Sequence, residues 1–370
     1  MAPAAKPKVV ETTATVAGGY TLPNGDWRPS YPVRYGPLFA FPTLDQPLKV
    51  LGWLLSYPGF LWPWNTIYLA LVMVSWRYMQ PPTADFAAPS LDLASPFARA
   101  CGVLLARNLA LLWLVAGGFW HLPLYTLGLQ GRERKYDARP QARGADAAKF
   151  LFSDQVLDNV FWSCCSGVPV QTAFEVLYFW ALATGRATAL DWDAHPVYSA
   201  LWLCCVPFWR ELHFYVGHRL LHVKAIYPYV HYLHHKNSNP GPWSGLAMHP
   251  IEHVIYFSVV LIHFVVPSHP VHFIFNSQHT ALTPSGGHHG YEGPILGGSV
   301  PTGSYFHYLH HRYFEVNYGE ATLPLDWLFG TFRDGLPDGE GSSLAGDEHG
   351  AEDEGAGNVA GKKARAKKSS

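Results

Sequence analysis

Histidine is the residue type whose number and spacing could do chemistry in this sequence. The chain of 370 residues has 20 histidines, and 17 of them lie between His213 and His311. Three blocks have helical spacing: His218 and His222 are four residues apart, and 231–235 and 307–311 each place histidines at i, i+3 and i+4. Residues three and four apart share one face of a helix, as the ligands of a metal ion must. The eight ligands predicted from these blocks are His218, His222, His231, His234, His235, His307, His310 and His311.

The size of this set predicts more than one metal ion. A structural zinc site has four protein ligands and a catalytic zinc site has three plus water, so eight imidazoles suit two ions with open positions. Imidazole binds iron, copper and zinc alike, so ligand type does not choose the metal. At the mouth of membrane helices the site would meet lipids, whose unactivated C–H bonds require an oxidant made from O₂ at iron. We therefore expect two non-haem iron ions, with O₂ as co-substrate.

Four further histidines are candidates for the same site. His249 and His253 lie four residues apart with Glu252 beside them, and we expect Glu252 to orient an imidazole. His288 and His289 lie in a glycine-rich stretch, where backbone can approach a site closely, and we favour His289 as the ligand. The four additional candidates are His249, His253, His288 and His289.

Two functions from other classes remain open. The residues His249-Pro-Ile-Glu252-His253 fit the H-x-x-E-H motif, in which glutamate is the general base of a zinc protease. A zinc membrane protease is therefore one alternative. A non-catalytic metal- or lipid-binding membrane protein is the other.

The composition predicts a chain that lies largely in lipid. Only 14% of the residues are charged, 15% are aromatic, and the net charge is −1. Near-neutral charge argues against a nucleic-acid partner, which would require a basic excess. Low charge with many tryptophans and tyrosines is typical of membrane helices and their interfacial belts. The predicted crossings are 60–76, 108–131, 159–184 and 194–209, and the apolar stretch 254–275, interrupted by prolines, is either a re-entrant hairpin or a further crossing.

These elements predict an all-α fold, an integral membrane bundle of about four transmembrane helices with a cytosolic histidine-rich helical cap. The predicted divisions are a flexible N-terminal tail (1–45), membrane helices and linkers (46–194), a catalytic domain (195–333) and a disordered tail, acidic and then basic (334–370). The chain ends in Lys367-Lys368-Ser369-Ser370, which resembles a cytosolic dilysine signal for retrieval to the endoplasmic reticulum. Lys367 and Lys368 would then contact a retrieval coat.

The histidine blocks resemble those of the fatty acid hydroxylase superfamily, and especially its sterol desaturase branch. Residues 217–222 and 231–235 resemble the first two histidine boxes, 303–319 resembles the third box with its Asn-Tyr-Gly trailer, and 325–332 resembles the closing segment. The resemblance covers roughly residues 195–333.

The resemblance implies an O₂-dependent non-haem di-iron oxidoreductase of the endoplasmic reticulum membrane. Its site would face the cytosol and receive electrons from a b-type cytochrome and an NAD(P)H reductase chain. With both termini cytosolic, the number of crossings is even, in agreement with four. The implied substrate is a sterol, modified as by a C5-desaturase, and a fatty-acyl or sphingolipid chain is the alternative within the same superfamily.

Overall fold

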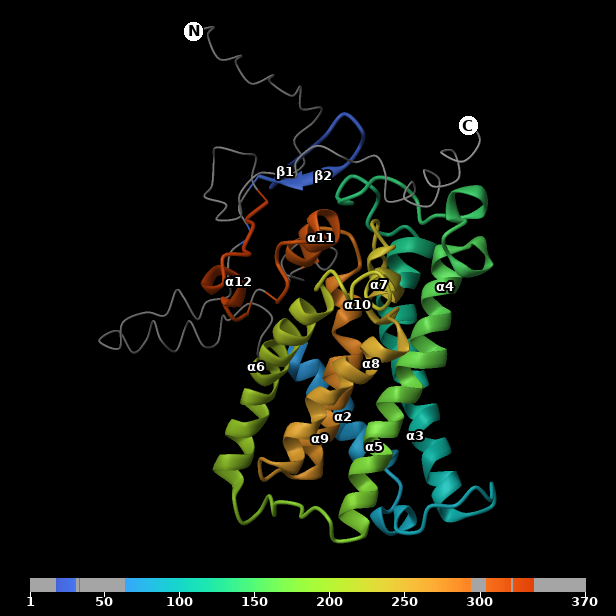
Figure 1. Ribbon diagram of the computed structural model, residues 1–370, viewed down its shortest axis with the longest axis vertical. Helices are drawn as coiled ribbons and strands as arrows, with labels where there is room; N and C mark the ends of the chain where they lie inside the picture. The colour runs from blue at the N-terminus through green and yellow to red at the C-terminus, as the bar shows by residue number, and fades with distance from the viewer. Residues whose placement is uncertain (1–17, 31–32, 34–63, 294–303, 321, 336–370) are drawn as a thin grey trace, which may run out of the picture.

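The protein, seen in a computed structural model, is mostly helical (Figure 1). The residues described are 18–30, 33, 64–293, 304–320 and 322–335. The longer helices are α2 (Trp64–Tyr78), α3 (Pro96–Leu112), the π-helix η3 (Trp113–Thr126), α4 (Gln155–Trp162), α5 (Val168–Ala183), α6 (Pro196–Leu221), α8 (Pro250–Phe257), α9 (Pro270–Leu282) and α11 (Ser304–Tyr313). The shorter helical segments are η2 (Thr83–Phe86), η4 (Gly144–Ala147), η5 (Leu151–Ser153), η6 (Ser163–Gly167), α7 (Tyr232–His235), η7 (Pro242–Leu246), η8 (Ser258–Phe264), α10 (Pro284–Gly287) and α12 (Leu325–Leu328).

Proline and capping residues determine where the long helices begin. Pro96, Pro196 and Pro270 occupy the first turn of their helices, where the missing N–H costs no hydrogen bond. Ser95 caps α3, because its Oγ accepts from the Ala98 N–H at 3.1 Å. These signals fix the lower ends of α3 and α6 in Figure 1.

The long helices form a bundle, and the short ones gather at one end of it. Helices α2, α3, α5, α6 and α9 run along the long axis, with α2 and α6 against α9, and α3 against α5 (Figure 1). Stacked rings tie α5 to α9, since the Tyr178 and Phe273 centroids are 4.0 Å apart. Helices α7, α10 and α11 lie at the upper end of the bundle in Figure 1, beneath the hairpin formed by β1 (Gly19–Thr21) and β2 (Trp27–Pro29).

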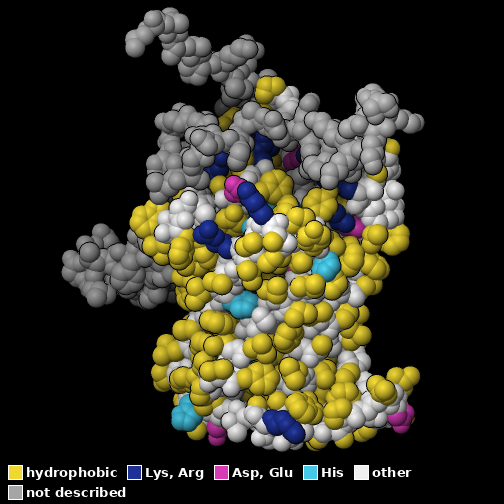
Figure 2. Space-filling view, viewed as in Figure 1, with side chains coloured by type: hydrophobic (Ala, Val, Ile, Leu, Met, Phe, Trp, Pro, Cys, Tyr) yellow, Lys and Arg dark blue, Asp and Glu magenta, His cyan; other side chains and the backbone are white. Residues whose placement is uncertain are grey.

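The outside of the bundle is apolar. In Figure 2 hydrophobic side chains cover the lower two thirds of the visible face, and most Lys and Arg side chains lie above them. Among the described residues one helix, Pro96–Thr126, is long and apolar enough to cross a membrane. The large apolar side chains that it exposes are Val103, Trp113, Leu114, Phe119 and Leu122. The prediction of four crossings is therefore supported for one helix, and the others stay predictions.

The helices differ from the predicted spans mainly at their ends. Helix α3 begins twelve residues before the predicted start at residue 108, because the Ser95 cap and Pro96 start it earlier. Helix α4 continues through η6 into α5, and the π-helical segment lies directly before Pro169, which has no N–H to donate. The predicted 60–76 span begins outside the described residues, and its described part is α2.

Helix α6 is longer than predicted, and this extension carries the first histidine block. The apolar run ends at Trp209, but the helix continues to Leu221. Arg210 is accommodated there because it forms an ion pair with Glu320. The 254–275 stretch is a helical turn-back: η8 ends at Phe264 and α9 starts at Pro270, and the two segments contact each other.

Part of the predicted flexible N-terminal tail is folded. Residues 18–30 form the β-hairpin, with Trp27 only 1% exposed and its N–H donating to the Lys135 carbonyl at 2.9 Å. Arg28 donates to the Tyr136 carbonyl at 2.5 Å, so the hairpin is attached to the 132–149 linker. The dilysine sequence at Lys367 and Lys368 lies outside the described residues.

Candidate metal centre

Histidines from four separate elements meet at the end of the bundle. His218 lies on the last turn of α6 and His222 is its C-cap residue. His231 precedes α7, which carries His234 and His235. His288 ends α10, and α11 carries His307, His310 and His311. All eight histidines predicted from helical spacing, together with His288, therefore lie in one buried region.

The nine imidazoles form two groups. Within each group one ring nitrogen from every histidine lies within 4.8 Å of the others. The five-histidine group is His218, His222, His231, His235 and His310. The four-histidine group is His234, His288, His307 and His311. Each adjacent pair is divided between the groups, because consecutive residues of a helix point about 100° apart.

The distances within the groups are those of ligands around an ion. In the five-histidine group the Nε2 atoms are 3.0 Å apart for His218 and His231, and 3.0 Å apart for His310 and His235. In the four-histidine group His288 Nε2 lies 3.0 Å from His307 Nε2 and 3.1 Å from His311 Nε2. Two nitrogens bound at right angles to one metal ion at about 2.1 Å lie about 3.0 Å apart.

The hydrogen bond made by Nδ1 decides which tautomer of each imidazole is present. In the five-histidine group His218 Nδ1 donates to the Tyr318 carbonyl at 2.6 Å and His310 Nδ1 to the Val316 carbonyl at 2.7 Å. In the four-histidine group His288 Nδ1 donates to the Pro284 carbonyl at 2.7 Å. A neutral imidazole has one N–H, so each Nε2 carries a bare lone pair. Lone pairs cannot donate to one another, and a cation is the partner that satisfies them.

For His231, the partner of Nδ1 is a carboxylate instead of a carbonyl. Glu252 Oε1 lies 2.8 Å from His231 Nδ1, and both side chains are buried. This is the role predicted for Glu252, an acidic group that orients an imidazole and raises its basicity.

Burial keeps these imidazoles neutral. It lowers the pKa of His234 to about 4. Burial and then the neighbouring imidazoles lower the pKa values of His231, His235 and His307 well below the ordinary value near 6.5. The neutral imidazole is the form that binds a metal, so each of the two groups could hold a cation at neutral pH.

The family comparison matches the part of the chain that carries these histidines. The model of the family described as "Fatty acid hydroxylase" matches residues 203–331, which include every member of both groups. This region of the chain is similar to the fatty acid hydroxylase family. The curated proteins similar to the chain include several sterol C5(6)-desaturases.

Three curated relatives show the range of similarity. The Delta(7)-sterol-C5(6)-desaturase of Nicotiana tabacum is 29% identical over 238 residues, 60% of this chain and 79% of the relative. The Delta(7)-sterol 5(6)-desaturase ERG3A of Gibberella zeae is 31% identical over 32% of this chain and 34% of its own length. Fatty acid hydroxylase ahd1 of Mycosarcoma maydis is 32% identical over 44% of this chain and 42% of its own length. The match thus spans less than half of each of these two fungal relatives. No solved structure matches the chain.

Three of the four additional candidates lie outside both histidine groups. His249 caps α8, because its Nδ1 accepts from the Ile251 N–H at 3.2 Å. His253 lies 3.0 Å from Ser166 Oγ through Nδ1 and 3.1 Å from the Leu246 carbonyl through Nε2, so neither nitrogen is open to a metal. With Glu252 bonded to His231, these residues do not assemble a protease-type zinc site.

The prediction favoured His289 over His288 as the ligand, whereas the structure places His288 in a histidine group and His289 outside both groups. His288 belongs to the four-histidine group. His289 stacks on Trp120 at 4.7 Å, and its Nδ1 accepts from the Tyr291 N–H at 3.1 Å. Neighbours in a loop point in different directions, so adjacency in sequence could not decide which ring enters the centre. One feature of the sequence favours His288. Pro284 lies four residues before it, and the Pro284 carbonyl accepts from His288 Nδ1–H.

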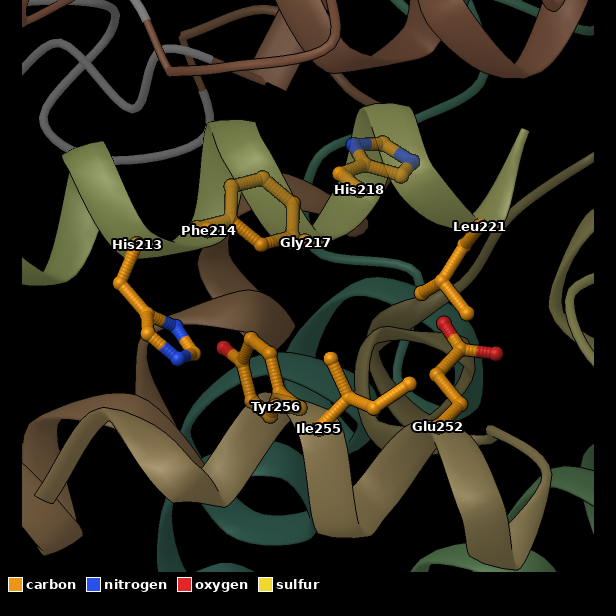
Figure 3. Close-up of a pocket in the computed structure, with 8 residues that line it drawn as sticks. All are labelled: His213, Phe214, Gly217, His218, Leu221, Glu252, Ile255 and Tyr256. Atoms are coloured by element: carbon orange, nitrogen blue, oxygen red, sulfur yellow. The ribbon is translucent and has the colours of Figure 1, made fainter. Parts of the chain in front are cut away.

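A small pocket reaches the centre from the side, between α6 and α8. It is lined by His213, Phe214, Gly217, His218, Leu221, Glu252, Ile255 and Tyr256. Figure 3 shows His218 and Glu252 at one end of it, and His213 and Tyr256 at the other. Most of its wall is apolar, and the neighbouring side chains Val216 and Val254 are exposed on the outside of the bundle. The pocket thus lies beside the five-histidine group, at a place where α6 and α8 also expose apolar side chains.

Proposed function

We propose that this protein is an O₂-dependent lipid desaturase or hydroxylase of the endoplasmic reticulum membrane, with a sterol as its substrate. The observation that carries the proposal is the pair of buried histidine groups, within a domain shared with curated sterol C5(6)-desaturases. Two iron ions, one in each group, would supply the activation of O₂ at a lipid C–H bond. A fatty-acyl substrate is the second candidate, supported by the similarity to a fatty acid hydroxylase.

The residues of the chain prepare the site for this chemistry. Carbonyls and Glu252 hold Nδ1–H groups and turn the Nε2 lone pairs inward. Four or five nitrogens around each position leave room for O₂ or substrate, because iron is commonly six-coordinate. Burial excludes water from the reacting carbon, and the pocket between α6 and α8 gives an apolar chain a path to His218.

Electron supply and topology belong to the same proposal. The reaction requires two electrons from outside the chain, and we propose a b-type cytochrome served by an NAD(P)H reductase as the donor. The bundle would cross the membrane several times, with the centre and both termini on the cytosolic side. Retrieval through Lys367 and Lys368 fits this topology.

The test is expression in yeast strains that each lack one sterol-desaturation or lipid-hydroxylation step, followed by lipid analysis. A restored sterol double bond is the expected result in the strain lacking C5 desaturation, and a hydroxylated acyl chain would support the second candidate. His234→Ala is the negative control, since it removes a member of the four-histidine group. Products unchanged by this substitution, or a protein with one zinc per chain and no O₂ uptake with lipid and reductant, would contradict the proposal.

A further inference from the structure

The chain turns back sharply after α11, in the segment 314–319. Phe314 and Asn317 have φ values of 64° and 54°, in the left-handed region that side chains other than glycine rarely adopt. The turn brings two carbonyls of this 314–319 loop to the five-histidine group. The Val316 carbonyl accepts from His310 Nδ1–H, and the Tyr318 carbonyl accepts from His218 Nδ1–H.

Asp326 on α12 holds this loop in place. Its Oδ1 accepts from the Tyr318 N–H at 2.8 Å, and its Oδ2 accepts from the Gly319 N–H at 2.8 Å. The Thr331 hydroxyl donates to Oδ1 at 2.7 Å. The approach is close, since a Cβ atom at Gly319 would lie 3.1 Å from Asp326 Oδ2. The Asp326 side chain is 0% exposed, so these three donors replace the water that a carboxylate otherwise binds.

Asn317 attaches the loop to the same closing segment. Its N–H donates to the Thr331 carbonyl at 2.8 Å, and its Oδ1 accepts from the Arg333 N–H at 2.8 Å. Asparagine tolerates the left-handed conformation better than most residues. The loop is therefore fixed by the segment 326–333, which lies outside all of the histidine blocks.

Among the described residues, the carbonyls of this loop accept hydrogen bonds from histidines of only one of the two groups. His218 and His310 both belong to the five-histidine group. In the four-histidine group His288 donates to the Pro284 carbonyl and His234 lies against the Ala247 carbonyl, neither of which is in the 314–319 loop.

We propose that Asp326 is a positioning residue that sets the orientation of His218 and His310, and thereby the metal affinity of the five-histidine group alone. The inference rests on the proposed metal centre and adds to it a residue that contacts no metal ligand directly. Loss of such a supporting contact weakens metal binding by about 10- to 100-fold. Removing Asp326 should therefore affect one ion and spare the other.

The experiment measures bound metal in the full-length protein in detergent. Wild type, Asp326→Ala and Asp326→Asn are loaded with Fe(II) under anaerobic conditions and dialysed against a graded series of a weak chelator. Metal per chain is then determined by mass spectrometry. Asp137→Ala is the matched control, because Asp137 is also a buried aspartate but is bonded to Arg139. We expect two ions per chain in wild type and Asp137→Ala, and about one in Asp326→Ala at chelator concentrations that leave wild type loaded.

Asp326→Asn keeps the side-chain volume and one acceptor oxygen, so it serves if the alanine variant does not fold. We expect it to lose the first ion at chelator concentrations between those of wild type and of Asp326→Ala, with the second ion unchanged. Metal retention in the Asp326 variants equal to that in Asp137→Ala, or loss of both ions at the same chelator concentration, would overturn the positioning role. A wild-type protein that binds no iron would instead contradict the proposed function, so the two failures are distinguishable.

Discussion

At the scale of single residues, the centre depends on histidines whose two ring nitrogens have different partners. In His218, His231, His288 and His310, Nδ1 donates to a carbonyl or to Glu252, and Nε2 faces an Nε2 atom of another histidine of its group. This arrangement fixes the tautomer before any ion binds. A substitution inside a group should therefore remove metal, whereas one at a histidine outside both groups, such as His249, should not.

His234→Ala is expected to reduce bound metal by about one ion per chain and to abolish product. His234 supplies one of only four histidine nitrogens in its group. His249→Ala is the matched control, since that ring caps α8 and its loss costs about 1 kcal/mol of stability. Metal analysis of the purified proteins checks both. Equal metal content in the two variants would show that the groups are assigned incorrectly.

The pH dependence of the metal-free protein follows from the same residues. Burial lowers the folded-state pKa of His234 to about 4, while an unfolded histidine has a pKa near 6.5. The unfolded state therefore binds more protons below pH 6.5, and the free energy of unfolding should decrease as the pH falls from about 6.5 towards 4. Thermal unfolding of chelator-treated protein at several pH values measures this decrease. A midpoint that stays constant between pH 7 and 5 would contradict it.

At the scale of elements, the spacing of α6 and α8 controls access to the centre. The helices are in van der Waals contact here, since a Cβ atom at Gly217 would lie 3.4 Å from Ile255 Cγ2. Both residues line the pocket in Figure 3. The two helices thus form an apolar opening whose width is set by small or branched side chains.

Ile255→Trp is expected to fill this opening and to lower turnover at least tenfold, with two metal ions retained. The indole is larger than the space beside Gly217, so a lipid chain could not reach His218. Ile251→Trp is the control, because Ile251 lies one turn earlier on α8 and is 54% exposed. Product formation and metal content are measured together. Normal turnover in Ile255→Trp would show that substrate enters by another route.

At the scale of the whole molecule, the histidine centre and the loops 87–95 and 184–195 lie at opposite ends of the bundle. Figure 1 shows the lower ends of α3, α5 and α6 joined or preceded by these loops, far from α7 and α11. Between the two ends the helix Pro96–Thr126 is long enough to span a bilayer. A cytosolic centre therefore predicts that the two loops face the lumen of the endoplasmic reticulum.

Inserted glycosylation sites test this orientation, because asparagine is glycosylated only on the lumenal side. An Asn-Gly-Thr sequence inserted after Asp193 should be glycosylated in microsomes and should lose mass on glycosidase treatment. The same insertion after Arg143, in the linker at the centre's end, should remain unmodified. Modification at Arg143 alone would reverse the proposed orientation.

The sequence by itself identified most of the histidines that the structure gathers into the two groups. Helical spacing identified eight of the nine histidines that the structure brings together, because i, i+3 and i+4 place side chains on one face without help from other elements. It also indicated an acidic partner for an imidazole at Glu252 and a mainly helical, apolar bundle. These features depend on residues that are close together in the sequence, so a pattern along the chain can reveal them.

Only the tertiary structure decided how the histidines divide and which isolated ones take part. His234 and His235 are neighbours in sequence but belong to different groups, because the partners that complete each group come from α6, α10 and α11. The same holds for His288 in preference to His289, and for Asp326, which acts on His218 over more than a hundred residues of chain. Such contacts depend on how helices and loops pack against one another, and no spacing along the chain encodes that packing directly.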